Sequence, residues 1–311
     1  MLASKVDRLL QIVAARGAPP FTLDKTVVPI NNVVAFSGGV DSSLAAALVF
    51  QVFPTTSAAC IGKSPALSSV QLQQAREVAH HIGIPLWESH THENKIKGYV
   101  ANQGNSCYYC KTTLYSTLNQ VADFAWKEMH HQMGNKSSQG PKLTSVIYNG
   151  TNADDHLDPT RVGLRAASEF NVVSPLSELT KQDVRDVAKY LGLPNWNAAA
   201  SPCLRSRLQF GVEATKHHLR QVEKAEDFLR TLLCLTPQMN LRVRLLAGNK
   251  AAVELDPDAL EEAIAHFDAI NTALRRLGFD AVDIRAFRTG SLSGYNATSL
   301  LAKIRKNPMA V

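Results

Sequence analysis

Short apolar runs alternate with amphipathic segments along the first part of the chain. The run at residues 33–36 predicts a buried strand, and residues 42–49, which open on two serines, predict the helix that follows. The same alternation continues with strands expected near residues 58–65, 85–87 and 146–148 and helices expected at 71–82 and 114–125. Strands that alternate with helices in this way indicate an α/β fold with a mostly parallel sheet.

The amphipathic segment after residue 180 carries clear helix-end signals. Thr180 can cap a helix whose third residue is Asp183, and Gly192 follows its last apolar position. After residue 211 the pattern changes to strands expected at 241–246, 253–255 and 282–284 and helices expected at 212–233, 257–267 and 270–277. This pattern predicts a smaller α+β module, so we expect two domains, residues 1–209 and 210–311.

The turn between the first strand and its helix has the composition of an anion site. Gly38 and Gly39 carry no side chain, so backbone N–H groups can approach a phosphate at the helix N-terminus. The hydroxyls of Ser37, Ser42 and Ser43 can donate further hydrogen bonds. The pattern G-x-x-x-x-G-K-[ST] is not present here, so a P-loop that hydrolyses a γ-phosphate is not predicted. The alternative is a turn that binds no ligand.

Polar residues also follow two later strands. Ser64 lies in the turn after the strand near residue 60, where parallel sheets bind ligands, and is placed to contact an adenine or a ribose. Asn152 and Asp154 follow the strand at 146–148, where amides and acids suggest a second wall of the nucleotide site. Asp154 and Asp155 offer oxygen ligands for Mg²⁺ on the pyrophosphate. The alternative for these side chains is that they only cap a turn.

Composition and charge narrow the class of protein. With 45% hydrophobic and 19% charged residues, the 311-residue chain has the composition of a soluble globular protein. No stretch approaches the roughly 20 apolar residues that a membrane helix needs, so no membrane partner is expected. The formal charge of +6 suits anionic small molecules and is too small to argue for nucleic acid.

The five cysteines, an odd number, and the lack of a signal-peptide pattern indicate a reducing compartment. We therefore expect a cytoplasmic protein. Residues 1–17 have helical apolar spacing and carry Lys5, Arg8 and Arg16 against Asp7 alone. An organellar targeting segment is the alternative to an ordinary first helix there.

Cys107 and Cys110 are three residues apart at a helix entrance, where both sulfurs can face one ion. Zinc usually requires four protein ligands, and no second pair of this kind is present. A redox dithiol, an iron–sulfur site completed by a third cysteine, and two buried cysteines beside aromatic residues all stay open.

Cys203 lies in a proline-bounded loop beside Arg205 and Arg207. Because neighbouring cations favour the thiolate form of a cysteine, Cys203 is a candidate nucleophile. Cys60 and Cys234 lie in apolar runs and are expected in the core.

Arg242 and Arg244 project to the same face of their strand because the side-chain period of a strand is two. They form a paired clamp suited to a phosphate, with a solvated charged face as the alternative. A further polar cluster is expected at residues 285–291. Residues 130–142 are polar and broken by glycine and proline, which predicts an exposed loop whose two histidines are solvated or, alternatively, bind metal.

Taken together, these motifs resemble one family, the LarE-type sulfur transferases that make the nickel-pincer nucleotide cofactor. The four strings that carry the resemblance are Ser37-Gly38-Gly39-Val40-Asp41-Ser42, Cys107-Tyr108-Tyr109-Cys110-Lys111, Gly150-Thr151-Asn152-Ala153-Asp154-Asp155 and Ser201-Pro202-Cys203-Leu204-x-Ser206-Arg207. The first is shared with the whole superfamily of PP-loop ATP pyrophosphatases, whereas the last two in combination are more selective. The resemblance implies a Rossmann-like PP-loop domain over residues 1–209 and a C-terminal domain for substrate binding and oligomerisation.

The resemblance implies that ATP adenylates a carboxylate of pyridinium-3,5-biscarboxylic acid mononucleotide and that sulfur then displaces AMP, which leaves a thiocarboxylate. Asp41 would assist a Mg²⁺ ion, and Arg242 and Arg244 would bind the substrate phosphate. The residues implied to bind ATP are Ser37, Gly38, Gly39, Asp41, Ser42, Ser43, Ser64, Asn152 and Asp154.

Cys203 matches the family's sulfur-handling cysteine. In members with one cysteine, that residue gives up its own sulfur and becomes dehydroalanine. In others, three cysteines hold a [4Fe-4S] cluster whose open iron carries a sulfide. This chain has Cys107, Cys110 and Cys203, so the resemblance favours the cluster form, with a sulfide donor, a small-molecule substrate and a homo-oligomeric state.

Other functions compete with this one. A PP-loop tRNA thiolase is expected to carry a stronger basic surface or an added RNA-binding domain. An amide-forming synthetase needs an ammonia source, and no glutaminase is evident. A non-catalytic nucleotide-binding protein is the alternative outside enzymes, and the joint presence of Asp41, Asp154, Cys203 and the arginine pair argues against it.

Overall fold

The computed structural model describes residues 2–19, 30–132, 145–158, 161–236, 238–288 and 290–292. The chain divides into two compact units. The first unit comprises Met1–Ser64, Ser69–His92 and Cys110–Ala198, and the second comprises Pro65–Ser68, Glu93–Tyr109 and Ala199–Val311. The functional division at residue 209 stays a prediction. The loop expected at residues 130–142 lies largely outside the described residues, as do the side chains of its two histidines.

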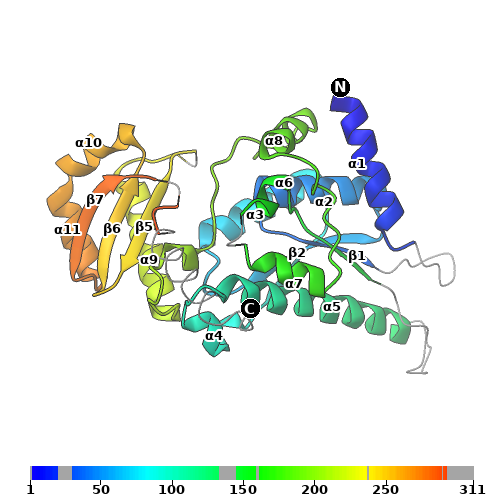
Figure 1. Cartoon of the computed structure of the whole chain (residues 1–311), viewed down its shortest axis with the longest axis horizontal. Helices are drawn as coiled ribbons and strands as arrows, with labels where there is room; N and C mark the ends of the chain where they lie inside the picture. The colour runs from blue at the N-terminus through cyan, green and yellow to red at the C-terminus, as the bar shows by residue number, and fades with distance from the viewer. Residues whose placement is uncertain are drawn as a thin grey trace. The chain divides into compact units, whose positions relative to one another are not determined.

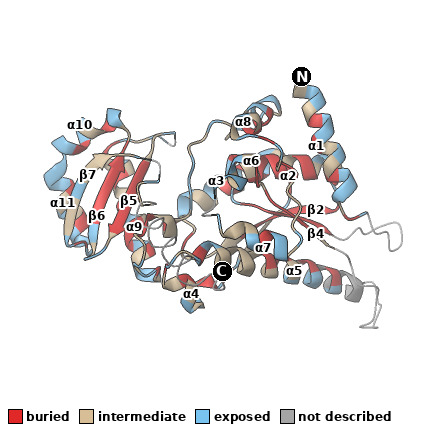
Figure 2. Cartoon of the chain, in the orientation of Figure 1, coloured by how far each residue is buried: buried red, intermediate tan, exposed pale blue. Residues whose placement is uncertain are grey.

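The first unit is built on a parallel sheet. Within the described residues its four strands have the order β3-β2-β1-β4, with bounds β1 (Asn32–Ala35), β2 (Ser57–Lys63), β3 (Leu86–His90) and β4 (Val146–Tyr148). Val33 of β1 pairs with Ala58 of β2 and with Ile147 of β4. Every residue of β1 is buried, and after Asn32 the strand is apolar without alternation, as is typical of parallel strands covered on both faces (Figure 2). The predicted parallel α/β fold is confirmed.

Helices cover both faces of this sheet. Figure 1 shows α1, α2 and α8 over one face and α5 and α7 over the other. The helices of this part of the chain are α1 (Leu2–Arg16), α2 (Val40–Val52), α3 (Ser69–Ile82), α5 (Ser106–Gln132), α6 (Ala153–His156), α7 (Gly163–Glu169) and α8 (Lys181–Tyr190). The core also holds polar contacts, and in one of them the buried Tyr148 hydroxyl donates to Oδ1 of Asn32 at 3.1 Å. Burial raises the pKa of Tyr148.

The helix ends follow the sequence signals. The side chain of Thr180 accepts a hydrogen bond from the backbone of Asp183, and the side chain of Asp183 accepts one from the backbone of Thr180. This reciprocal pair is a capping box. Gly192 follows α8 with a φ of +73°, a conformation that glycine adopts without steric cost. The predicted helix start at Thr180 is confirmed.

The second unit contains a mixed sheet of order β5-β6-β7 in the described residues. Strand β5 (Leu241–Leu246) is antiparallel to β6 (Lys250–Leu255), and β6 is parallel to β7 (Ala281–Ala286). Helix α9 packs on β5, and α10 and α11 pack on β7. The helical segments of this unit are η1 (Glu93–Lys95), α4 (Lys97–Val100), η2 (Leu204–Arg207), α9 (Lys216–Leu232), α10 (Pro257–Ala265) and α11 (Phe267–Arg276). The smaller α+β module is confirmed.

The two cysteines expected in the core differ. Cys60 of β2 is buried, and its burial raises the pKa of its thiol. Cys234 is exposed, so the core prediction for this residue was wrong. It lies just beyond the end of α9, where the chain turns with a φ of +47° and the apolar stripe of the helix has ended. No described helix combines the length and the apolar character needed to span a bilayer.

Candidate functional site

The loop between β1 and α2 is shaped by glycine. Gly38 has a φ of +74°, and a Cβ atom at this position would lie 2.8 Å from Cα of Ala75. Gly39 is the N-cap residue of α2, and no side chain hydrogen-bonds to this helix start as a cap. The helices α6, α8 and α9 do have side-chain caps. The first turn of α2 therefore presents backbone N–H groups that suit an anion.

Serine hydroxyls and one asparagine hold the loop in this shape. Ser42 Oγ donates to the carbonyl of Gly39 at 3.0 Å and accepts from the backbone N–H of Ser37 at 3.2 Å. Asn195 Nδ2 donates to the carbonyl of Gly38 at 2.8 Å and to Oγ of the buried Ser43 at 3.0 Å. Ser43 is thus linked to the loop through Asn195. That Ser43 binds ATP stays a prediction.

Asp41 connects the loop to the end of β4. Its Oδ1 accepts from Nδ2 of Asn152 at 2.9 Å, and its Oδ2 accepts from Nζ of Lys181 at 2.5 Å. A Cβ atom on Gly150 would lie 2.5 Å from the carbonyl carbon of Asp41 and 2.6 Å from the backbone nitrogen of Ser42. Glycine at 150 therefore lets the chain after β4 meet the first turn of α2 backbone to backbone.

The carboxylates of Asp154 and Asp155, which follow β4, have different partners. Asn152 and Asp155 form the capping box of α6, and Asp155 also pairs with Arg161 at 2.8 Å. Oδ2 of Asp154 accepts the backbone N–H of Lys181 at 3.0 Å. Asn152 therefore both caps a helix and reaches Asp41. Ser64 directly follows β2, at the same sheet edge as the loop after β1.

Two residues that contact the loop after β1 or Asp41 were not predicted from the sequence. Lys181 and Asn195 both contact the loop or its aspartate, as described above. Their contacts are long-range, so no local spacing reveals them. The one signal in the sequence was that Lys181 is a cation at the first position of a helix with a clear capping box.

The second unit holds the Cys203 loop against β5. Arg244 Nη1 donates to the carbonyl of Ser206 at 3.1 Å, and Arg242 Nη2 donates to the carbonyl of Ala200. Arg207, from the loop itself, donates to the carbonyls of Pro202 and Cys203. Three guanidinium groups therefore fix the backbone on both sides of the half-buried Cys203.

These arginines are buried, so the solvated charged face considered from the sequence was wrong. Arg242 is 4% exposed and Arg244 is 7% exposed. Strand β5 is buried along most of its length, which a period of two cannot reveal. Arg207 pairs with Glu226 at 2.9 Å, and Arg244 pairs with the fully buried Glu254 at 2.8 Å.

Arg242 is different, because no carboxylate among the described residues pairs with it. Burial, together with the neighbouring positive charge of Arg207, lowers the pKa of Arg242 to about 10. Its guanidinium also lies over the ring of Phe287, 5.7 Å from the ring centroid. A buried cation without a counter-ion favours an anionic ligand. Of the polar cluster expected at 285–291, Thr289 lies outside the described residues.

Cys107, the first cysteine of the pair at the start of α5, has Arg205 as a hydrogen-bond partner. Arg205 Nη2 donates to Sγ of the exposed Cys107 at 2.8 Å, and Arg205 Nη1 donates to Oδ1 of Asn102 at 3.0 Å. Cys107 and Cys203 belong to the second unit and Cys110 to the first. Across the described parts of the chain, no three His, Cys, Asp or Glu side chains are grouped as a metal site. A cluster on Cys107, Cys110 and Cys203 would thus draw its ligands from both units, and it stays a prediction.

Comparison with known proteins places this geometry in a family. No family model matches the chain. Over 268 residues it is 31% identical to the pyridinium-3,5-bisthiocarboxylic acid mononucleotide synthase of Lactiplantibacillus plantarum, which covers 84% of this chain and 88% of that protein. The chain belongs to the LarE-type family of PP-loop sulfur transferases.

Two further relatives define the extent of the LarE-type likeness. An uncharacterized protein of Synechocystis is 32% identical over 299 residues, which covers 94% of this chain and 98% of that protein. The tRNA-specific 2-thiouridylase MnmA of Halothermothrix orenii is 28% identical over 185 residues, 51% of each chain. The likeness to LarE-type proteins therefore extends over most of the chain, and the likeness to MnmA over half of it.

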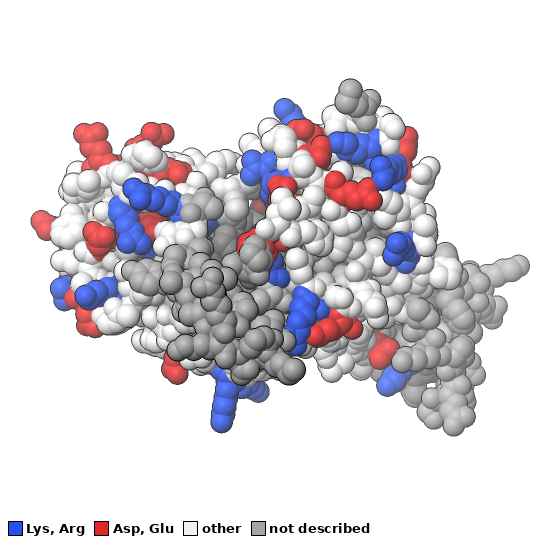
Figure 3. All heavy atoms as spheres, in the orientation of Figure 1, with Lys and Arg blue, Asp and Glu red and all other residues white. Residues whose placement is uncertain are grey.

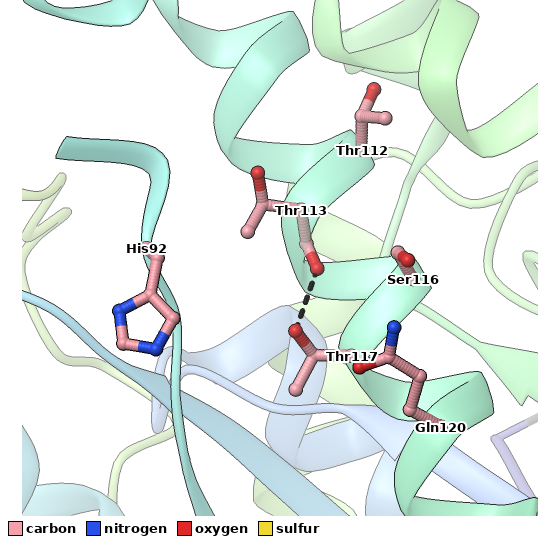
Figure 4. A pocket seen from close by; sticks show the side chains of 6 residues that line it. All are labelled: His92, Thr112, Thr113, Ser116, Thr117 and Gln120. Carbon is pink, nitrogen blue, oxygen red and sulfur yellow. Dashed lines mark hydrogen bonds between the residues drawn. The ribbon is translucent and has the colours of Figure 1, made fainter. Parts of the chain in front are cut away.

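The LarE-type chain also has a separate cavity of about 330 Å³ in the first unit. It is lined by His92, which follows β3, and by hydroxyl and amide side chains of α5, namely Thr112, Thr113, Ser116, Thr117 and Gln120. Figure 4 shows the hydroxyl of Thr117 bonded to the carbonyl of Thr113 on the side that faces His92. None of the residues predicted for the functional site lines this cavity.

The surface charges are mixed. On the face drawn in Figure 3, lysine and arginine side chains are interspersed with aspartate and glutamate side chains over each unit. Among the described residues visible there, no extended area carries positive charge alone. This distribution matches the small formal charge of +6.

Proposed function

We propose that this protein is an ATP-dependent sulfur transferase that converts a carboxylate of pyridinium-3,5-biscarboxylic acid mononucleotide to a thiocarboxylate. The relative from Lactiplantibacillus plantarum is named for the corresponding bisthiocarboxylic acid mononucleotide. The observation that carries the proposal is the Cys203 loop fixed on β5 beside Arg242, a buried cation without a carboxylate partner in the described residues. This arrangement offers a sulfur atom and an anion site in one unit.

The first unit supplies the residues for adenylation. The uncapped start of α2 and the loop at Gly38 and Gly39 suit the pyrophosphate part of ATP. A substrate carboxylate oxygen attacks the α-phosphorus, the bond from that phosphorus to the oxygen bridging the β-phosphate breaks, and pyrophosphate leaves. Asp41 and Asp154 offer carboxylate oxygens that suit Mg²⁺, which when bound offsets negative phosphate charge.

Adenylation prepares the substrate for sulfur. A carboxylate is a poor electrophile, and the acyl adenylate carries AMP as a leaving group. The sulfur of Cys203 attacks the acyl carbon, the bond from carbon to AMP oxygen breaks, and a thioester forms. Loss of the Cα proton of Cys203 with cleavage of its Cβ–S bond then leaves a thiocarboxylate on the substrate and dehydroalanine in the chain.

A [4Fe-4S] cluster on Cys107, Cys110 and Cys203 is the other source of sulfur that the family offers. Within the described residues no group of three metal-ligating side chains is found, and Cys110 belongs to another unit than Cys107 and Cys203, so we derive no step through a cluster. The cluster, a sulfide donor, a homo-oligomeric state and a cytoplasmic location stay predictions.

Arg242 and Arg244 are proposed to bind the phosphate of the mononucleotide. Arg244 already has Glu254 as a partner, so Arg242 contributes the uncompensated charge. A phosphate that pairs with Arg242 would hold the pyridinium ring in the same unit as Cys203.

The test is substrate-dependent release of pyrophosphate. Purified protein is given Mg²⁺, ATP and either the biscarboxylic acid mononucleotide, its monocarboxylic analogue nicotinic acid mononucleotide, or bulk tRNA. We expect AMP and pyrophosphate in equal amounts with the biscarboxylic acid mononucleotide and none with tRNA. Release with tRNA alone would support a thiolase instead, and release with none of the three would overturn the proposed adenylation.

A further inference from the structure

The loop that follows β1 contains no basic residue. Residues 36–43 read Phe-Ser-Gly-Gly-Val-Asp-Ser-Ser, so the charged side chain in the loop is the carboxylate of Asp41. Loops of the G-x-x-x-x-G-K-[ST] type carry a lysine that reaches the phosphates. A polyphosphate placed near Asp41 needs a comparable cation, and in this chain the cation has to come from another element.

Lys181, the first residue of α8, is that cation by position. Its Nζ lies 2.5 Å from Oδ2 of Asp41, and its backbone N–H donates to Oδ2 of Asp154 at 3.0 Å. One residue thus contacts both carboxylates that the sequence assigns to the nucleotide. The capping box of Thr180 and Asp183 fixes the start of α8, and the ion pair of Asp183 with Lys5 ties it to α1. Figure 1 shows α2, α6 and α8 on the same side of the sheet.

The ion pair of Lys181 with Asp41 is not explained by folding stability alone. The side chains of Lys181 and Asp41 are 36% and 27% exposed. Ion pairs that water reaches contribute little to folding, typically about 0–1 kcal/mol. Asp41 also has Asn152 as a second donor, which fixes its carboxylate without the lysine.

We propose that Lys181 is the phosphate-binding cation of this site. In the nucleotide-free protein its ammonium group pairs with Asp41. When ATP is bound, the flexible lysine stem brings the ammonium onto the pyrophosphate part, and Asp41 is released for Mg²⁺. When the bond between the α-phosphorus and the bridging oxygen breaks, the bonding electrons pass to the leaving pyrophosphate. Lys181 stabilises that charge and keeps its protons. This inference rests on the proposed adenylation.

The test separates phosphate binding from chemistry. Binding of inorganic pyrophosphate with Mg²⁺, and of adenosine, is measured by calorimetry for the full chain and for Lys181→Met. We expect Lys181→Met to weaken pyrophosphate binding by at least about tenfold and to leave adenosine binding unchanged. In AMP formation we expect kcat to fall by roughly 10²–10³-fold, the loss typical of removing one group that stabilises transition-state charge.

Two further variants serve as controls. Lys189→Met removes an exposed lysine of the same helix, which lies over the ring of Trp196, and is expected to match the unmodified protein. Lys181→Arg keeps the charge and is expected to retain most of the pyrophosphate affinity while losing part of kcat. A purely structural role for Lys181 would weaken adenosine and pyrophosphate binding alike.

The two proposals fail in different ways. If the unmodified protein binds pyrophosphate through Lys181 but adenylates no carboxylate, the proposed function is wrong and the role of Lys181 stands. If the unmodified protein adenylates the mononucleotide and Lys181→Met equals it in pyrophosphate affinity and kcat, the inference about Lys181 is overturned.

Discussion

Arg244 donates from Nε to Oε2 of Glu254 at 2.8 Å, and Glu254 has no exposed surface. The same carboxylate accepts from Arg285 at 2.8 Å and from the hydroxyl of Ser291 at 3.0 Å. Since Arg244 also holds the carbonyl of Ser206, this contact links β6 to the loop that carries Cys203. A single buried acid therefore positions part of the sulfur site without touching the sulfur.

Glu254→Gln should destabilise the second unit strongly. The change leaves the buried guanidinium of Arg244 without its counter-charge, and breaking a buried pair in this way typically costs about 3–5 kcal/mol. Urea unfolding at pH 7 measures the loss, with the exposed Glu261→Gln of α10 as the control. A loss below about 1 kcal/mol for Glu254→Gln would show that the pair does not hold this sheet together.

Arg242→Gln should weaken binding of the mononucleotide through its phosphate. Hydrogen bonds to charged groups contribute about 1.5–3 kcal/mol, so we expect KM for the mononucleotide to rise by roughly 10–100-fold. The matched measurement uses the same substrate without its phosphate. For that nucleoside, the variant and the unmodified protein should have similar KM values. An equal rise for both substrates would mean that Arg242 acts only on the shape of the Cys203 loop.

Gly39→Ala should lower ATP affinity alone, whereas Gly150→Ala should lower stability as well. A Cβ at Gly39 would meet only Oγ of Ser37, at 3.4 Å, so the nucleotide-free protein should keep its stability. The added methyl group would stand where phosphate has to approach the loop, so ATP affinity should fall. A Cβ at Gly150 meets the backbone of Asp41 and Ser42 instead, so Gly150→Ala should lower the melting temperature as well. Calorimetry and thermal unfolding measure both, and equal ATP affinity for Gly39→Ala would contradict phosphate binding there.

Acid should remove the stabilising effect of Glu88. Hydrogen bonds from Arg76 and then Lys63 lower the pKa of Glu88 to about 2, whereas an unfolded glutamate titrates near 4.3. A lowered folded pKa stabilises the fold fully above the unfolded pKa, and this stabilisation is lost as the pH falls toward 2. Glu88→Gln should therefore be less stable than the unmodified protein at pH 6, with the difference shrinking at pH 4 and again at pH 3. A constant difference in urea unfolding across these values would rule out this linkage.

Local signals in the sequence were sufficient for much of the fold. The capping residues Thr180 and Asp183 predicted the start of α8 because their contacts lie within one turn. The glycine loop after β1 was predicted because strand, turn and helix start are adjacent in the chain. Strand β6 begins at Lys250, earlier than the predicted residue 253, because a tight turn at 247–249 pairs it with β5 along its full length.

The rest depends on contacts that join distant parts of the chain. Periodicity placed Arg242 and Arg244 on one face of β5, but burial of that face is decided by the Cys203 loop and by Glu254. Lys181 reaches Asp41 across 140 residues, so no spacing rule could propose it. Cys234 was predicted to be buried and is exposed. Its sequence neighbours are apolar, but it lies beyond the end of a helix.

The most direct test of the account follows the sulfur of Cys203. The protein is purified without oxygen, its iron is measured, and one turnover with ATP and the biscarboxylic acid mononucleotide is analysed by mass spectrometry of product and intact chain. We predict a thiocarboxylate product and a chain that has lost the equivalent of one H₂S at Cys203, with Cys203→Ala stopping at the adenylate. A thiocarboxylate formed at the normal yield by Cys203→Ala would contradict the account. An iron-loaded chain of unchanged mass after turnover would show that the sulfur comes from a cluster and not from Cys203 itself.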